Sequence, residues 1–268
     1  HLGNINPSGT QLTESFWFAG GVPMVQWMLR DMLDLDVLTV TGKTLGENLE
    51  DLQKDNWFDR NLGYLANYGL TRDQVIFPVE KAHEKGSVAI LKGNIAPDGA
   101  IVKLAGVPEN LYHFEGEAII FHEIDDAIAA LRAGQLKPGH AIVIRYLGPK
   151  GRFGTTAFTF QKELAGTDLF DKVAIITDGR FSGGSHGLSI GYVAPEAAIL
   201  GPLAAVKNGD KVVVDVKDRT INMEVSDEEI AKRLSEVDWE LDGAKFKPFL
   251  RLFAKNVTST AKGATWGD

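Results

Sequence analysis

The sequence predicts an α/β protein in which a helical segment, residues 1 to 76, precedes a β-rich α/β domain, residues 77–268. Apolar residues recur at helical spacing before Phe77, whereas short β-branched segments bounded by Gly, Pro or Asp dominate after it. Because these strand-like segments outnumber the helical ones, a compact barrel-like sheet with flanking helices is favoured over a doubly wound sheet.

Four patterns make up the N-terminal segment. In Val22–Leu33 the apolar residues follow an amphipathic helical period, and Pro23 suits a first helical turn. Residues 44–53 predict a second helix. Between these two helices, DVLTVTG at residues 36–42 predicts a short strand and turn, and the aromatic stretch 56–74 predicts irregular structure.

Strand patterns dominate the second domain, and helices are predicted between some of them. One helix is predicted at Glu123–Gly134, ending on a glycine, and another begins after Ser226, with Glu229 completing a capping box. Strands are predicted at residues 87–93, 100–106, 116–121, 141–148, 172–179, 211–216 and 220–225.

Composition narrows the classes of function. The formal charge is −8 with both signs interspersed, which argues against nucleic acid or a membrane surface as the main partner. No apolar run reaches the ~18 residues that a membrane span needs. The chain has no cysteine, so it cannot supply thiolates for catalysis or metal binding. We expect a cytoplasmic enzyme, or an organellar one in a eukaryote.

The first residue is His1, without an initiator Met or a signal-peptide pattern, so we expect a fragment or a processed chain. Gly42, Lys43 and Thr44 lie between a predicted strand and helix, as in a phosphate-binding loop. That loop requires a glycine five residues earlier, where this chain has Val37. A structural turn, with Thr44 near the helix cap, is the favoured interpretation.

The candidate functional loop is TDGRFSGGSHG, residues 177–187, which follows an apolar strand segment. Gly183 and Gly184 permit left-handed torsions and close approach of a ligand, and successive amides in such a turn can bind an anion. Arg180 and His186 add positive charge that suits a carboxylate.

Serine supplies the reactive oxygen of this loop. Ser182 or Ser185 can act as a nucleophile or, beside strong positive charge such as a metal, as a base. A structural Gly-rich turn with a capping serine explains the same residues, and the pattern alone leaves both interpretations open.

Longer segments carry a family resemblance. VAIITDGRFSGGSHGLSIGYVAPEAA and GPLAAVKNGD resemble the signature of the dihydroxy-acid and sugar-acid dehydratases, which are iron–sulfur enzymes. NPSG, AGGVP, LKGNIAPDGAIVKLAGV and FAKNVTSTAKGA also resemble family segments in family order, so the resemblance covers essentially the whole chain. It implies the C-terminal half of a longer enzyme, with a swivelling β/β/α domain after the end of an N-terminal α/β domain.

The resemblance implies a hydro-lyase that removes water from a 2,3-dihydroxy carboxylic acid to give a 2-keto acid. The loop is most similar to the branch that acts in branched-chain amino-acid biosynthesis, and sugar-acid (aldonate) dehydratases are the alternative. Ser182 is the implied base for the C2 proton. The implied contacts to the substrate come from Arg180, Gly183, Gly184, Ser185 and His186.

The family also implies an iron–sulfur cluster, as Lewis acid on the C3 hydroxyl, and Mg²⁺, which orients the substrate. The cluster ligands are expected in the missing N-terminal half. The implied partners are a small dihydroxy acid, that missing half, and further copies of the chain in a homodimer or tetramer.

One segment departs from the family pattern. Where the family has a glutamate that binds Mg²⁺, this chain has Ala157, and Glu163 is the nearest carboxylate that could substitute. Three explanations stay open: a divergent active enzyme, a catalytically impaired member that acts as a binding or structural subunit, or a deleted segment.

Overall fold

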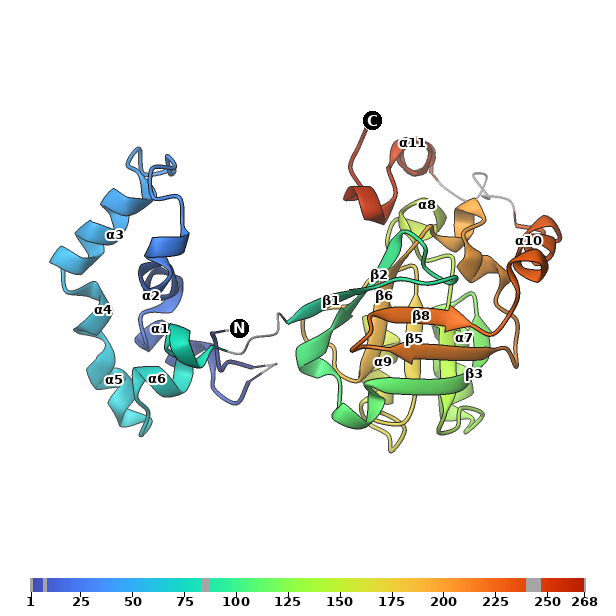
Figure 1. Ribbon diagram of the computed structural model, residues 1–268, viewed down its shortest axis with the longest axis horizontal. Coiled ribbons are helices and arrows are strands. Elements are labelled where there is room, and N and C mark those ends of the chain that lie inside the picture. The colour runs from blue at the N-terminus through green and yellow to red at the C-terminus, as the bar shows by residue number, and fades with distance from the viewer. Residues whose placement is uncertain (1, 7–8, 83–86, 240–246, 268) are drawn as a thin grey trace. The chain divides into compact units, whose positions relative to one another are not determined.

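The chain folds into two units, His1–Gly86 and Ser87–Asp268 (Figure 1). The computed structural model of the protein describes residues 2–6, 9–82, 87–239 and 247–267, so His1 lies outside the described residues. Across those ranges, no helix combines the length and the apolar character that crossing a bilayer requires.

Short helices build the first unit. Its longest helix, α3 (Leu45–Lys54), begins with a capping box between Thr44 and Glu47. The Thr44 hydroxyl accepts the Glu47 N–H, and the Glu47 carboxylate accepts the Thr44 N–H at 2.7 Å. The elements are α1 Thr13–Phe18, α2 Gly21–Met28, α3 Leu45–Lys54, α4 Trp57–Arg60, α5 Leu62–Asn67, α6 Arg72–Val75 and the 3₁₀ turns Arg30–Met32 and Val79–Lys81.

The sequence predictions for this unit are confirmed for α2 and α3 and wrong for two segments. Residues 36–42 form a turn, in which Leu38 makes one isolated bridge to Thr44, and Val40 is fully exposed. Within the described part of the first unit, no second strand covers these β-branched residues. Residues 56–74 are helical rather than irregular, since they contain α4, α5 and the start of α6.

An eight-stranded sheet forms the second unit, in the order β1-β2-β6-β5-β4-β3-β7-β8. The four strands from β6 to β3 are parallel neighbours, and the remaining pairs are antiparallel. The strands are β1 Val88–Leu91, β2 Gly99–Lys103, β3 His113–Phe121, β4 His140–Ile144, β5 Ala174–Thr177, β6 Leu188–Ala194, β7 Lys211–Asp215 and β8 Thr220–Met223.

A seam between the residues after β1 and strand β8 nearly closes this sheet into a barrel. The Ile221 N–H donates to the Lys92 carbonyl at 3.0 Å. The side chain of Asn94 both donates to and accepts from the Met223 backbone, each at 2.8 Å. Gly93 permits this approach, because a Cβ there would lie 2.0 Å from the Ile221 oxygen. The predicted barrel-like sheet is confirmed.

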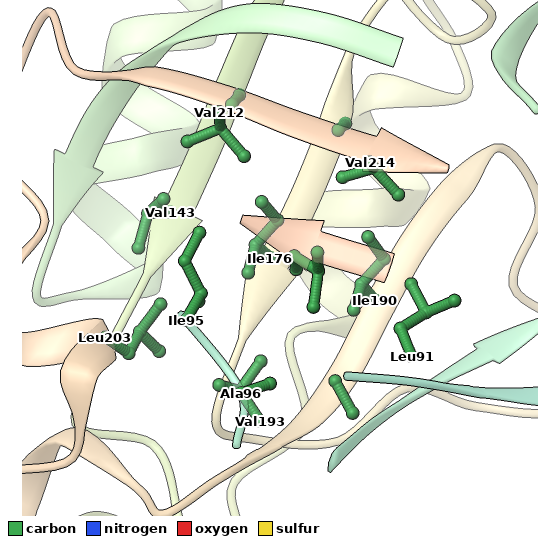
Figure 2. Packing of buried hydrophobic residues seen from close by; sticks show 14 of the residues in the cluster. Leu91, Ile95, Ala96, Val143, Ile176, Ile190, Val193, Leu203, Val212 and Val214 are labelled. Atoms are coloured by element: carbon green, nitrogen blue, oxygen red, sulfur yellow. The ribbon is translucent and has the colours of Figure 1, made fainter. Parts of the chain in front are cut away.

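Alternate side chains of each strand fill opposite faces of the barrel wall. Val143, Ile176 and Val214 point into the interior, from which water is excluded (Figure 2). Ile142 and Ile175, their strand neighbours, face the other way and pack under helices. Those helices and the others of this unit are α7 Ile124–Arg132, α8 Pro149–Arg152, α9 Phe158–Leu164, α10 Asp227–Ser235 and α11 Pro248–Asn256.

Short 3₁₀ turns complete the unit at Leu104–Gly106, Glu109–Leu111, Ala197–Ile199, Pro202–Ala205 and Thr260–Lys262. The predicted helices correspond to α7 and α10, and the Ser226 hydroxyl caps α10 by accepting the Glu229 N–H at 3.3 Å. Strand β6 is absent from the sequence predictions. Its Gly191 breaks the β-branched pattern, yet a Cβ there would lie 3.1 Å from the Phe181 ring, so glycine lets the candidate loop pack over this strand.

We expect Ile176→Ala to destabilise the protein by about 2–5 kcal/mol, because it leaves a cavity inside the barrel. The free energy of unfolding, measured by denaturant titration, checks this value. Ile90→Ala is the matched control, since Ile90 on β1 is exposed, and it should cost less than about 1 kcal/mol. Equal effects of the two substitutions would contradict the assignment of Ile176 to the barrel interior.

Candidate functional site

The candidate loop is the connection between two parallel neighbours, β5 and β6. Parallel strands usually need a crossover of a dozen or more residues that contains a helix. Here residues 178–187, which contain no helix, make the whole connection from the end of β5 to the start of β6. The loop must therefore be held by segments outside itself.

Asp178 is the first anchor of the loop and is completely buried. One carboxylate oxygen accepts the Leu147 N–H at 2.8 Å, and the other accepts the N–H groups of Tyr146 at 3.1 Å and Ala197 at 2.9 Å. Burial raises the pKa of Asp178, while these three donors favour its ionised form. The carboxylate thus joins the loop to the turns that follow β4 and β6.

Arg180 is the second anchor. Its backbone N–H donates to the Thr155 carbonyl at 3.1 Å, and its carbonyl accepts the Ala157 N–H at 2.8 Å. Its side-chain Nε donates to the Gly154 carbonyl. The structure therefore directs Arg180 toward residues 154–157.

The tip of the loop is a tight turn. The Ser185 N–H donates to the Ser182 carbonyl at 3.0 Å, and the Gly184 N–H donates to the Ser182 hydroxyl at 3.2 Å. Neither Gly183 nor Gly184 adopts a positive φ, but a Cβ on Gly183 would meet nothing within 4 Å. The turn thus leaves open space beside the exposed Ser182 hydroxyl.

A pocket of about 170 Å³ lies between this turn and strands β1, β2 and β6. Its apolar wall includes Val88, Ile101 and Phe181. Its polar lining includes Ser182, Gly183, Ser185 and Lys103. Arg180, Gly184 and His186 are not among the described residues that line it. The structure therefore brings Ser182, Gly183 and Ser185 together in one pocket.

Lys103, from β2, is a pocket residue that the sequence analysis missed. Its ammonium donates to the Gly183 carbonyl at 2.5 Å. The side chain is half-buried, and burial lowers the pKa of Lys103. A lysine two residues after the exposed Ile101 has the pattern of a solvent-facing strand position, so the sequence gives no signal for this role.

His186 lies at the other end of the turn, with its ring 6.3 Å from that of Phe170. Its carbonyl accepts the Gln161 side chain at 3.1 Å and the Ser189 hydroxyl at 3.0 Å. Backbone contacts at His186 therefore tie the loop to α9 and β6.

Glu196 is a second buried carboxylate near the loop, and the sequence analysis also missed it. Its oxygens accept the N–H of Lys150 at 2.9 Å and of Gly151 at 3.0 Å, at the start of α8. Burial raises the pKa of Glu196 to about 7 against these donors, and the nearby charge of Asp178 adds to the rise. In the sequence, Glu196 stands within VAIITDGRFSGGSHGLSIGYVAPEAA, which carries the family resemblance but gives no separate signal for a buried carboxylate.

No described part of this chain forms a metal site. The described residues contain no cluster of three His, Cys, Asp or Glu that could hold a metal ion, and the chain has no cysteine. Ala157 is fully buried in the hydrophobic cluster that helices α7 and α9 form with strands β4 and β5. Glu163 pairs with Arg132 of α7 at 3.0 Å. The residues present therefore do not fit an iron–sulfur cluster or Mg²⁺ on their own.

Comparison with known proteins identifies the family to which the chain belongs, that of the dihydroxy-acid/6-phosphogluconate dehydratases. Residues 74–264 match the C-terminal family model, and residues 1–48 match the N-terminal one. The resemblance noted in the sequence is thus confirmed.

The most similar curated relatives include enzymes named dihydroxy-acid dehydratase. The protein of Thermodesulfovibrio yellowstonii is 42% identical over 98% of this chain and that of Caldicellulosiruptor bescii 38% over 98%. The protein of Aquifex aeolicus is 38% identical over 97% of the chain. The chain spans 45%, 46% and 44% of these relatives, respectively.

We expect Asp178→Asn to destabilise the protein by about 1–3 kcal/mol, because an amide can replace only one of the two accepting oxygens. Denaturant titration measures this loss. Hydrogen exchange at the Tyr146, Leu147 and Ala197 amides should also accelerate. Asp171→Asn is the control, since Asp171 is exposed. Unchanged exchange at the three amides would refute the anchoring role.

The raised pKa of Glu196 predicts a pH-dependent stability. Unfolded Glu196 has a pKa near 4.5, so between this value and about 7 the folded state binds more protons than the unfolded state. Stability should therefore fall as pH rises through this window and level off above it. The contribution of Glu196 is at most about 3 kcal/mol.

Glu196→Gln, the uncharged isostere, isolates this contribution. Relative to the variant, the wild type should lose stability in denaturant titrations as pH rises from about 4.5 to about 7. Glu236→Gln, at an exposed residue, is the control and should preserve the wild-type profile. Parallel profiles for the wild type and Glu196→Gln would show that the pKa of Glu196 is not raised.

Proposed function

We propose that this chain is the C-terminal part of a hydro-lyase that converts a 2,3-dihydroxy carboxylic acid to a 2-keto acid. The observation that carries the proposal is the pocket, in which a family-type glycine loop presents the Ser182 hydroxyl to open space beside a lysine. Family membership, and relatives named dihydroxy-acid dehydratase, support this substrate class.

In the proposed reaction, Ser182 Oγ accepts the proton released when the C2–H bond breaks. The C3–O bond breaks, and the hydroxyl takes up a proton and leaves as water. The resulting enol then tautomerises to the 2-keto acid. A serine oxygen is a competent base only when positive charge favours its ionised form, and the pocket's charge from this chain is that of Lys103.

We propose that the iron–sulfur cluster and Mg²⁺ expected for the family are held by residues outside this chain. The absence of cysteine and of an acidic cluster among the described residues supports that division. We further propose that the C-terminal unit is a swivelling domain with its family boundary near residue 76, which the family model's start at residue 74 supports.

We also propose that the full-length enzyme works as a homodimer or tetramer on a small dissolved acid. The proposed compartment is the cytoplasm, or an organelle in a eukaryote. Within the family, the dihydroxy-acid branch of branched-chain amino-acid biosynthesis is favoured over the sugar-acid branch by the names of the relatives.

A catalytically impaired family member is the second candidate, and Ala157 is its motivation. Its side chain is buried in a hydrophobic cluster, and Glu163 is already paired with Arg132. Neither residue is therefore available as the Mg²⁺-binding carboxylate that the family pattern has at position 157. Such a protein would bind the acid without dehydrating it.

Ser182→Ala in the full-length, cluster-loaded enzyme should lower kcat by at least about 100-fold, because it removes the proposed base. Substrate affinity should remain close to wild type. Keto-acid formation and equilibrium binding are the two measurements. Ser235→Ala on α10 is the control, because Ser235 is exposed and does not line the pocket. Unchanged kcat would refute the role of Ser182, and binding without turnover in the wild type would favour the impaired member.

A further inference from the structure

The pocket beside the glycine loop carries one uncompensated charge. Among its described lining residues, Lys103 is the one lysine, arginine, histidine, aspartate or glutamate. Its ammonium contacts a carbonyl, that of Gly183, rather than a carboxylate. A half-buried ammonium without a counter-ion, next to the apolar side chains of Ile101 and Phe181, favours the binding of an anion there.

Two polar groups of the pocket, the Lys103 ammonium and the Ser185 hydroxyl, also have unused hydrogen-bonding capacity. An ammonium has three N–H donors, and within the described chain Lys103 uses one of them, on Gly183. Ser185 is 3% exposed, and its hydroxyl has no hydrogen-bond partner among the described residues. A buried hydroxyl without a partner costs free energy, so a ligand that accepts from it is stabilised.

We propose that Lys103 and Ser185 together bind the carboxylate of the substrate acid. The proposal rests on the proposed function for the substrate's chemical class. The ammonium supplies the opposite charge and the buried hydroxyl supplies a second donor, and a carboxylate has two oxygens to accept both.

The position of this carboxylate site relative to Ser182 suits the proposed chemistry. The Ser185 N–H binds the Ser182 carbonyl, so both hydroxyls belong to one turn and line one pocket. C2 of the substrate is bonded directly to the carboxylate carbon. Anchoring the carboxylate at Lys103 and Ser185 therefore keeps C2 inside the space that Ser182 also lines.

The basic side chains of the loop itself are directed elsewhere. Arg180 donates its Nε to the Gly154 carbonyl, and the His186 ring lies near Phe170. Lys103 reaches the same turn from β2, whose Val102 pairs with Ile190 of β6. Because β2 and β6 are adjacent strands of a rigid wall, the lysine is held in place by the barrel rather than by the loop.

A matched pair of ligands tests the proposal in the full-length protein. 2-Hydroxy-3-methylbutanoate lacks the leaving hydroxyl and is not dehydrated, and its amide differs from it by the charge of the carboxylate. Isothermal titration calorimetry gives the affinity of each ligand. The wild type should bind the acid at least about tenfold more tightly than the amide, since a charge-assisted hydrogen bond contributes that much.

Lys103→Gln should reduce this acid-to-amide ratio by at least about tenfold, and Lys103→Arg should retain most of it. Ser185→Ala should weaken both ligands by about two- to tenfold, because the carbonyl oxygen of either accepts from the hydroxyl. Lys172→Gln, at an exposed lysine that does not line the pocket, is the control. Circular dichroism establishes that each variant is folded.

The outcomes separate this proposal from the proposed function. An unchanged acid-to-amide ratio in folded Lys103→Gln, or no preference for the acid in the wild type, overturns the carboxylate site. If the wild type dehydrates a dihydroxy acid while binding is independent of Lys103, only this site is wrong. If binding depends on Lys103 but no dihydroxy acid or aldonate is dehydrated, the site stands and the hydro-lyase assignment fails.

Discussion

The buried carboxylate of Asp178 joins three separate segments of the chain: the loop, the turn after β4 and the segment after β6. Glu196 makes a similar connection, because its carboxylate accepts backbone N–H groups at the start of α8. Each carboxylate satisfies backbone N–H groups that would otherwise be buried without partners. Two buried acids that accept backbone N–H groups thus connect the segments that follow β4 and β6.

This arrangement leaves the tip of the loop with few structural contacts of its own. Because Asp178 and Arg180 fix the first part of the loop, residues 182–185 need to make few contacts, and Ser182 stays exposed at the pocket. The lysine that faces this turn comes from the barrel wall, which is stabilised by a continuous hydrophobic interior. Rigid strands therefore position the charge, while a short turn presents the hydroxyl of Ser182, the proposed base.

Periodicity predicted the barrel because its strands are β-branched and its helices are amphipathic, and both properties follow from burial on one face. It failed at β6, where Gly191 makes room for Phe181, and at residues 36–42, where no neighbouring strand is available. For the site, the glycine loop was visible as a composition change. Lys103, Asp178 and Glu196 were not recognised, because their roles depend on which distant backbone groups the fold brings beside them.

The absence of a helix between β5 and β6 has a further consequence for how this loop can vary. Surface loops ordinarily tolerate insertions because their ends are fixed and their length is not. Here the connection must run from the end of β5 back to the start of β6, because the two strands are parallel. Asp178 is bound near one end of it, and near the other end the Gly187 N–H donates to the Gly106 carbonyl. A substitution between these points keeps the length of the connection, but an added or deleted residue would shift the pairing of β6 against β5. In this loop, evolution can alter the chemistry by substitution far more readily than by changing its length.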